Sequence, residues 1–260
     1  DLTVVKLARG MHQVLAKWLG HLVHQPYPAA NFEVTVVALP CETDTDAMLD
    51  RFCSGGPVRM RCLHAPRDNA AAARNLAVMQ AQGRWLLFLD ETLLAGSHLV
   101  EHHVTCQQRN GHVAAVVGRI DYHPQLDART ASKVGRLTQQ TFQPGQPLSF
   151  LDWRAQNLSL PRDAVLDLGG FSEDLPFEGL EDLELGYRLE RSVGIRGHYC
   201  DQAQAFLWKP EPLDREAGRC YAEGYWLHHL LETTESEQLR ERYRGIVAAW
   251  RGAADPVMLP

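Results

Sequence analysis

Three short runs of mainly apolar residues constrain the fold of this chain more than any other feature. They are LTVVKL at residues 2–7, VTVVAL at 34–39 and WLLFL at 85–89. A strand that is apolar at every position, such as WLLFL, is expected to be covered on both faces. The runs therefore predict a parallel sheet with helices on both sides, which places the chain in the α/β class.

The segments between these runs carry helical patterns. Residues 11–25 place apolar side chains at helical spacing, and Thr45–Phe52 is a candidate for a short helix. The segment at 69–83 predicts a helix that is capped by Asp68 and ends near Gly83. In such sheets ligands bind outside the carboxyl ends of the strands, and Asp90 directly follows one of these ends.

The second half of the chain is less regular. A strand is expected at 114–120, and a helix is expected from Glu181 onward, since acidic residues fill its first turn. Two further helical segments, at about 214–232 and 235–250, close the chain.

Composition excludes some classes of function. The chain has 32 acidic and 26 basic residues, and the phosphates of a nucleic acid require a basic surface, so no nucleic-acid partner is expected. No apolar run approaches the ~20 residues of a membrane-spanning helix, and the cysteines are scattered, so we expect a cytoplasmic protein with reduced thiols. The basic run at 240–244 is interpreted as a solvated helix face, with peripheral membrane association as the alternative.

Specific motifs stand out against this background. They are the opening strands LTVV and FEVTVV, the segment NAAAARNLAVMQAQGRWLLFLDET at 69–92, and QNLSLPRDAVLDLGGFSEDLPFEGLEDLELGYRL at 156–189. In this order and spacing they resemble the family 2 glycosyltransferases over roughly residues 2–230. The combination of GGF with EDLELGYRL is the most specific element of the resemblance.

The resemblance implies a GT-A-like fold with a mostly parallel sheet. It places a nucleotide-binding α/β half at 1–110, an acceptor-binding half of the same domain at 111–210, and C-terminal helices at 211–260. The implied partners are a nucleotide-sugar donor and a carbohydrate or other hydroxyl acceptor. The implied reaction transfers the sugar with inversion, for which a carboxylate removes the proton of the acceptor hydroxyl.

The resemblance also assigns site residues. The catalytic candidates are Asp182 as the base and its neighbour Glu181. Acidic residues at a helix N-terminus also complement the helix dipole, which is the alternative interpretation of both. The remaining candidates are Ala8, Leu39, Arg74, Asp90 and Glu91 for donor binding, and Asn157, Gly170 and Trp208 for acceptor binding.

The donor side departs from the family pattern. The family's second strand ends in two aspartates, where this chain has Ala38 and Leu39, and the family's D-x-D motif ends in an aspartate, where this chain has Thr92. Asp90 is then the main remaining ligand for Mg²⁺ or Mn²⁺, which prefer carboxylate oxygens. We therefore expect a weak requirement for a metal ion or none, and of these two we favour none.

Two hypotheses follow from this pattern. The first is an inverting glycosyltransferase in which Lys209, Arg74 or Arg9 supplies the positive charge that a metal ion supplies elsewhere. The second is a non-catalytic glycosyltransferase-like module that binds carbohydrate or a protein partner.

Overall fold

The computed structural model describes the greater part of the chain. The described residues are 1–9, 12–40, 49, 53, 56–111, 113–126, 142–143, 146–175, 179–208, 218, 221–222, 224–226, 228–229, 241 and 244. The chain divides into two compact units, Asp1–Glu211 and Pro212–Pro260. In the second unit the described positions are helical, whereas most of the two helices predicted there, like the helix predicted at Thr45–Phe52, lies outside the described residues.

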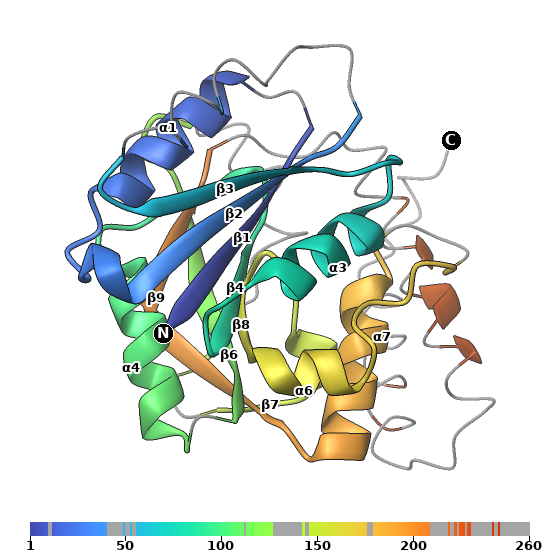
Figure 1. The fold of residues 1–260 in the computed structure, drawn as a ribbon. Helices are drawn as coiled ribbons and strands as arrows, with labels where there is room; N and C mark the ends of the chain where they lie inside the picture. The colour runs from blue at the N-terminus through green and yellow to red at the C-terminus, as the bar shows by residue number, and fades with distance from the viewer. Residues whose placement is uncertain are drawn as a thin grey trace, which may run out of the picture. The chain divides into compact units, whose positions relative to one another are not determined.

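The first unit is built on one mixed sheet (Figure 1). Its order is β3-β2-β1-β4-β8-β6-β9-β5, with β7 paired to β9. The strands β3, β2, β1 and β4 run parallel, β8 is antiparallel to both β4 and β6, and β6 and β9 are parallel again. The strand bounds are β1 Leu2–Ala8, β2 Phe32–Ala38, β3 Arg59–His64, β4 Trp85–Leu89, β5 Leu93–Ala95, β6 Ala114–Tyr122, β7 Pro147–Leu148, β8 Asn157–Pro161 and β9 Arg196–Leu207.

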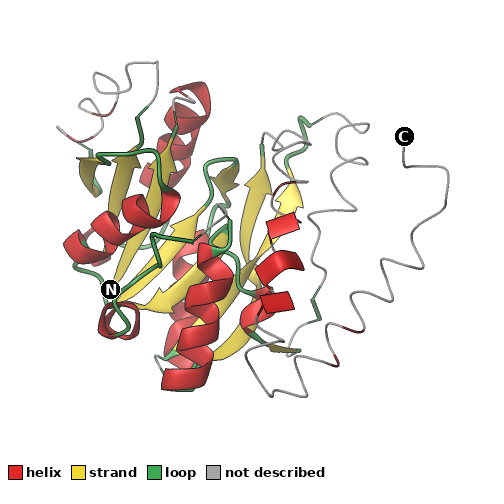
Figure 2. Ribbon diagram, turned by 90° about the vertical axis from the view of Figure 1, so that its right-hand side faces the viewer, coloured by secondary structure: helices red, strands yellow, loops and turns green. Residues whose placement is uncertain are grey.

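Helices cover both faces of this sheet (Figures 1 and 2). On one face, α1 and α4 bury apolar side chains against the sheet in a single core cluster, and on the other face α3 and α6 lie against the strands, with α7 beside them. The helix bounds are α1 His12–Val23, α3 Ala70–Gln80, α4 Leu99–Arg109, α6 Arg162–Asp167 and α7 Glu181–Arg188, with short helical turns η1 Ala29–Asn31, η2 Phe150–Asp152 and η3 Leu189–Val193.

The predicted α/β class with a mostly parallel sheet is confirmed, and the predicted strand at 85–89 is β4, buried at every position. Strand β3 was missed because it is half-exposed and reads RMRCLH, which carries no clear apolar pattern. Helix α3 ends at Gln80, before Gly83. Gly83 serves a close approach instead, since a Cβ there would overlap the main chain of Thr3.

The predicted cap of α3 was wrong by one residue. Asn69 has extended backbone angles, and its side chain accepts a hydrogen bond from the main-chain N–H of Ala72 at 2.8 Å. Asp68 instead pairs with Arg9, whose Nε lies 3.0 Å from a carboxylate oxygen of Asp68. The Asn69 side chain satisfies a helix N–H that has no partner within the helix.

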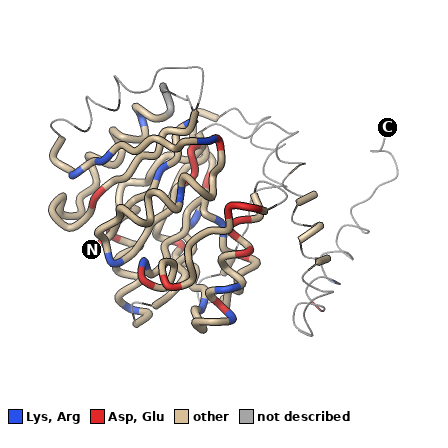
Figure 3. Tube along the Cα trace, turned by 45° about the vertical axis from the view of Figure 1, so that its right-hand side comes forward, with Lys and Arg blue, Asp and Glu red and all other residues tan. Residues whose placement is uncertain are grey.

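Charged residues of both signs occur throughout the described part of the chain. Figure 3 shows Lys and Arg interspersed with Asp and Glu along the described trace. Within the described ranges, no helix is both long enough and apolar enough to cross a membrane.

Candidate active site

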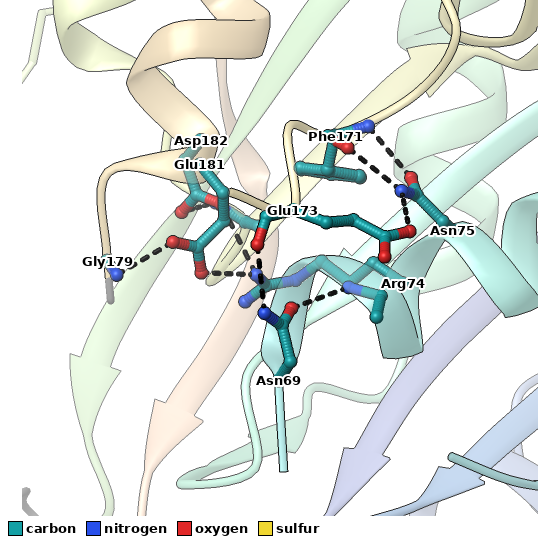
Figure 4. Close-up of polar contacts among 10 residues, drawn as sticks. Asn69, Arg74, Asn75, Phe171, Glu173, Gly179, Glu181 and Asp182 are labelled. Carbon is teal, nitrogen blue, oxygen red and sulfur yellow. Dashed lines mark hydrogen bonds and ion pairs between the residues drawn. The ribbon is translucent and has the colours of Figure 1, made fainter. Parts of the chain in front are cut away.

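The candidate site forms where α7 begins beside α3 (Figure 4). Helix α7 presents Glu181 and Asp182 in its first turn. Arg74 reaches them from α3, with Nη1 at 2.7 Å from Oε1 of Glu181 and 3.7 Å from Oδ1 of Asp182. The three side chains are only 7–13% exposed, so water screens their charges weakly.

The two acidic residues differ in their environment. Glu181 accepts a hydrogen bond from the main-chain N–H of Gly179 at 2.7 Å in addition to its pair with Arg74. Burial disfavours the charged form of Glu181, but Arg74 and these hydrogen bonds outweigh it and lower the pKa of Glu181. Burial raises the pKa of Asp182, and the charge of Arg74 does not fully offset it.

The Asp182 carboxylate is fixed at one oxygen. Its Oδ2 accepts a hydrogen bond from the main-chain N–H of Ala155 at 2.8 Å. Its Oδ1 is buried and has no hydrogen-bond partner among the described residues. Asp182 is therefore a held carboxylate with a raised pKa and one oxygen not engaged in a hydrogen bond, which are properties of a general base.

Asn75 clamps the GGF loop onto α3. Its Oδ1 accepts a hydrogen bond from the N–H of Phe171 at 2.8 Å, and its Nδ2 donates to the carbonyl of Phe171 at 2.9 Å. Gly170 has a φ of +78°, and a Cβ at this position would overlap Oδ1 of Asn75. Glycine is required here both for the left-handed backbone and for the close approach.

Two further residues fix the same loop. Glu173 accepts hydrogen bonds from Nδ2 of Asn75 at 2.9 Å and from Arg67 at 2.5 Å. On the other side, Arg188 donates to the carbonyls of Leu168 and Gly170 at 2.8 and 2.7 Å. The motifs ARN, GGF and ELGYRL therefore form one interlocked structure around Glu181 and Asp182.

The donor-side candidates other than Arg74 lie at the carboxyl ends of β1, β2 and β4. Ala8 and Leu39 are buried, and the carbonyl of Ala8 accepts the N–H of Leu39 at 2.9 Å. Oε2 of Glu91 accepts the main-chain N–H of Arg9 at 3.2 Å. Arg74, predicted for donor binding, directs its guanidinium to the acidic pair instead, so its donor role stays a prediction.

In the turn after β4, Thr92 supplies no carboxylate and its hydroxyl is engaged with Asp90. Oδ1 of Asp90 accepts two hydrogen bonds from Thr92, one from its N–H at 2.8 Å and one from its hydroxyl at 2.6 Å. The Thr92 hydroxyl thus acts as a donor and is buried. Among the described residues, no three His, Cys, Asp or Glu side chains gather in a metal-binding arrangement. Mg²⁺ is usually bound by one or two carboxylates together with the phosphates of its ligand, so Asp90 and Glu91 are the residues of this turn that would hold such an ion.

Sequence reasoning missed Lys6 on the donor side. This lysine is 1% exposed in the middle of β1, and it donates hydrogen bonds to the carbonyls of Asp90 and, at 3.4 Å, Leu93. The signal was present in the sequence, because a lysine inside a buried parallel strand is unusual.

The acceptor-side candidates do not gather around Asp182 as one cluster. Asn157 is 1% exposed, and its amide bonds internally to His103 at 2.9 Å and to the carbonyls of Arg119 and Ala203 at 3.1 and 2.9 Å. The main-chain N–H of Trp208 donates to the main-chain carbonyl of Thr92 at 2.9 Å, on the donor side. Gly170 serves the clamp with Asn75. Acceptor binding by these three residues stays a prediction.

Comparison with known proteins bears on this site. The family model described as "Glycosyl transferase family 2" matches residues 8–154, which is more than half of the chain. The chain belongs to this family. The resemblance drawn from the motifs is thereby confirmed. Comparison with curated protein sequences gave no significant match.

Solved structures with a similar fold confirm the predicted GT-A-like fold. TarS of S. aureus, residues 1–349 in complex with UDP-GlcNAc, matches with a TM-score of 0.71 at 13% identity, covering 100% of this chain and 76% of that chain. The mannosyltransferase PcManGT from Pyrobaculum calidifontis, in complex with GDP-Man and Mn²⁺, matches with a TM-score of 0.69 at 16% identity, covering 93% and 67%. At these identities the likeness shows the fold alone.

The chain also matches a longer structure of S. aureus TarS, of which it covers less than half. It spans 42% of the longer TarS chain, which it matches with a TM-score of 0.67 at 13% identity over 94% of its own length.

Proposed function

We propose that this family 2 glycosyltransferase moves a sugar from a nucleotide-sugar donor to an acceptor hydroxyl with inversion. The observation that carries the proposal is the Asp182 carboxylate, held by Ala155 beside the Arg74–Glu181 pair. In the proposed step the acceptor oxygen bonds to the anomeric carbon while the bond from that carbon to the diphosphate oxygen breaks. The nucleoside diphosphate leaves with the electron pair, and Asp182 takes the hydroxyl proton.

The contrast between the two acidic residues supports this division of roles. Because its pKa is lowered, Glu181 stays ionised and holds Arg74 in place. Because its pKa is raised, Asp182 accepts a proton more readily than an ordinary aspartate. Neighbouring carboxyl groups whose environments shift their pKa values in opposite directions are typical of acid–base sites.

We assign donor binding to residues 1–110 and acceptor binding to residues 111–210. The donor assignment is supported by the position of Asp90 and Glu91 after β4, where ligands of α/β sheets bind. The similar structures of TarS and PcManGT hold UDP-GlcNAc and GDP-Man, so a nucleotide-sugar is the donor class we propose.

One observation favours the alternative of a non-catalytic module. Oδ1 of Asp182 is buried, although a base has to reach its acceptor. Catalytic contacts often tighten only when the substrate is bound, so we retain the enzyme as the leading proposal.

Titration calorimetry with UDP, GDP, CMP and TDP, each with and without Mn²⁺, tests the donor. One of these nucleotides is expected to bind, and the matching sugar nucleotide is expected to be transferred or hydrolysed. If none binds and no sugar nucleotide is hydrolysed, the enzyme is ruled out in favour of the module.

Asp182→Asn tests the base. It is expected to abolish transfer and to leave nucleotide affinity unchanged, because it removes a proton acceptor and little volume. Asp163→Asn, at an exposed side chain on α6, is the matched control and should retain full activity. Turnover by the Asp182→Asn variant would show that the base lies elsewhere.

A further inference from the structure

Lys6 is a charged residue at a fully buried position. It lies in β1, the strand between β2 and β4, and the strands on both sides pair with it in parallel. Moving an ammonium group out of water is costly, so a fully buried lysine is a candidate for a functional role.

The ammonium of Lys6 has a partner in each of three directions. It donates to the carbonyl of Asp90 and, at 3.4 Å, to the carbonyl of Leu93, and it lies 4.8 Å from the centre of the Trp18 ring. The two carbonyls belong to the turn that carries Asp90, Glu91 and Thr92. Lys6 therefore fixes this turn, at the carboxyl end of β4, through hydrogen bonds to two of its main-chain carbonyls.

The charge of Lys6 also acts on the carboxylates of this turn. Burial lowers the pKa of Lys6 to about 7, and the negative charges of Asp90 and Glu91 oppose this change. The ammonium thus interacts favourably with both carboxylates through a poorly screened interior.

A crevice that holds a nucleoside diphosphate needs a counter-charge for Asp90 and Glu91, since both would repel the phosphates. The Thr92 hydroxyl donates to Asp90, so this turn offers a divalent cation one carboxylate fewer than the D-x-D turn of the family does. Lys6, built into β1, is a cation that the fold provides at this turn, and the charge of Arg74 also acts on Asp90.

We propose that Lys6 is a positioning residue of the donor crevice, whose buried ammonium holds the Asp90–Leu93 turn and offsets Asp90 and Glu91 so that a nucleoside diphosphate binds without a divalent cation. This inference rests on the proposed nucleotide-sugar function. Because Lys6 is buried, it acts through the turn and through its charge, not by direct contact with the donor.

Lys6→Met tests this inference in the full chain, because it removes the charge and keeps the length of the side chain. In EDTA, the wild-type protein is expected to bind UDP or GDP, and the Lys6→Met variant is expected to bind it at least about tenfold more weakly. Affinity for uridine or guanosine, measured by competition, should not change, because these nucleosides carry no phosphate.

Thr35→Val is the matched control. Thr35 is also fully buried, on the adjacent strand β2, and its hydroxyl has no hydrogen-bond partner among the described residues. The control should bind the diphosphate as the wild type does. The Lys6→Met variant should melt at a higher temperature than the wild type, since it no longer buries a charge.

Each contrary outcome has a distinct meaning. If the wild type binds a nucleoside diphosphate only with Mn²⁺, or if Lys6→Met binds it equally well or fails to fold, this inference is overturned and the proposed function stands. If the nucleoside affinity falls in parallel, Lys6 has only a structural role. If the wild type binds no nucleotide with or without Mn²⁺, both proposals are overturned.

Discussion

Arg74 joins both acidic residues at the start of α7, with Nη1 at 2.7 Å from Oε1 of Glu181 and 3.7 Å from Oδ1 of Asp182. Arg74 and Glu181 are 107 positions apart in the sequence. Burial disfavours the charge of Arg74, yet the two carboxylates outweigh this effect and raise its pKa. The ion pair therefore links α3 to α7 and keeps the guanidinium charged at any working pH.

Removing the charge of Arg74 should destabilise the protein strongly. Arg74→Met leaves Glu181 and Asp182 buried without a counter-ion, for which we expect a loss of about 3–5 kcal/mol in the free energy of unfolding, measured by urea denaturation. Arg74→Lys keeps the charge and should lose less. Arg109→Met, at an exposed position on α4, is the control. Equal stability of Arg74→Met and the wild type would contradict the coupling.

The two adjacent glycines of the GGF loop should respond differently to alanine. Gly169 and Gly170 have φ values of +80° and +78°, so alanine at either position incurs backbone strain of about 1–2 kcal/mol. Only at Gly170 would the new Cβ also overlap Asn75, whereas the space around Gly169 is open. Thermal unfolding should therefore show a clearly larger loss for Gly170→Ala. Equal losses in stability for the two variants would mean that the Asn75 side chain can move away from the new Cβ without a loss of free energy.

The buried His103 should make stability depend on pH. Burial lowers the pKa of His103 to about 4, below the ordinary value of 6.5. Between these values the unfolded chain binds more protons than the folded one, so this contribution to stability is complete above pH 6.5 and decreases as the pH falls toward 4. The loss should reach about 3 kcal/mol.

Urea unfolding at several pH values measures the effect of His103. His103→Gln should flatten the profile between pH 6.5 and 4, whereas His24→Gln, at an exposed position on the chain, should retain the slope. An unchanged slope in His103→Gln would show that other groups cause it.

Thr92→Asp should create a dependence on Mn²⁺. The Thr92 hydroxyl now donates a hydrogen bond to Asp90 at 2.6 Å, so a carboxylate at this position would face the Asp90 carboxylate and repel it. In EDTA the Thr92→Asp variant should therefore have a lower melting temperature than Thr92→Val. Saturating Mn²⁺ should raise its melting temperature, because an ion that binds only the folded state stabilises it by about 2.7 kcal/mol at 100 times its Kd. Thermal unfolding with and without Mn²⁺ gives the result. An equal rise for the wild type would show that Thr92 does not prevent metal binding.

The sequence by itself determined the fold class and the positions of several elements. Local periodicity and composition predict the buried strand at 85–89 and the helix that begins at Glu181. Both are local properties, because the direction of successive side chains depends only on neighbours along the chain. The motifs also identified the family, since their order and spacing are properties of the sequence.

Local patterns were insufficient where the deciding contact is distant. Asn69, not the predicted Asp68, caps α3. The Nδ2 of Asn69 also donates a hydrogen bond to the main-chain carbonyl of Glu173 at 3.1 Å, a contact between residues far apart in the sequence. Asn157 matched a motif, yet the fold surrounds its amide with His103 and two main-chain carbonyls.

Only the tertiary structure decided which charges meet. The sequence shows Lys6, Arg74 and Asp182 as separate residues, and the sheet brings Lys6 beneath Asp90 while α3 brings Arg74 to Asp182. The electrostatic energy of a buried group depends on distance and on exclusion of water, and neither is encoded in the spacing of residues along the chain.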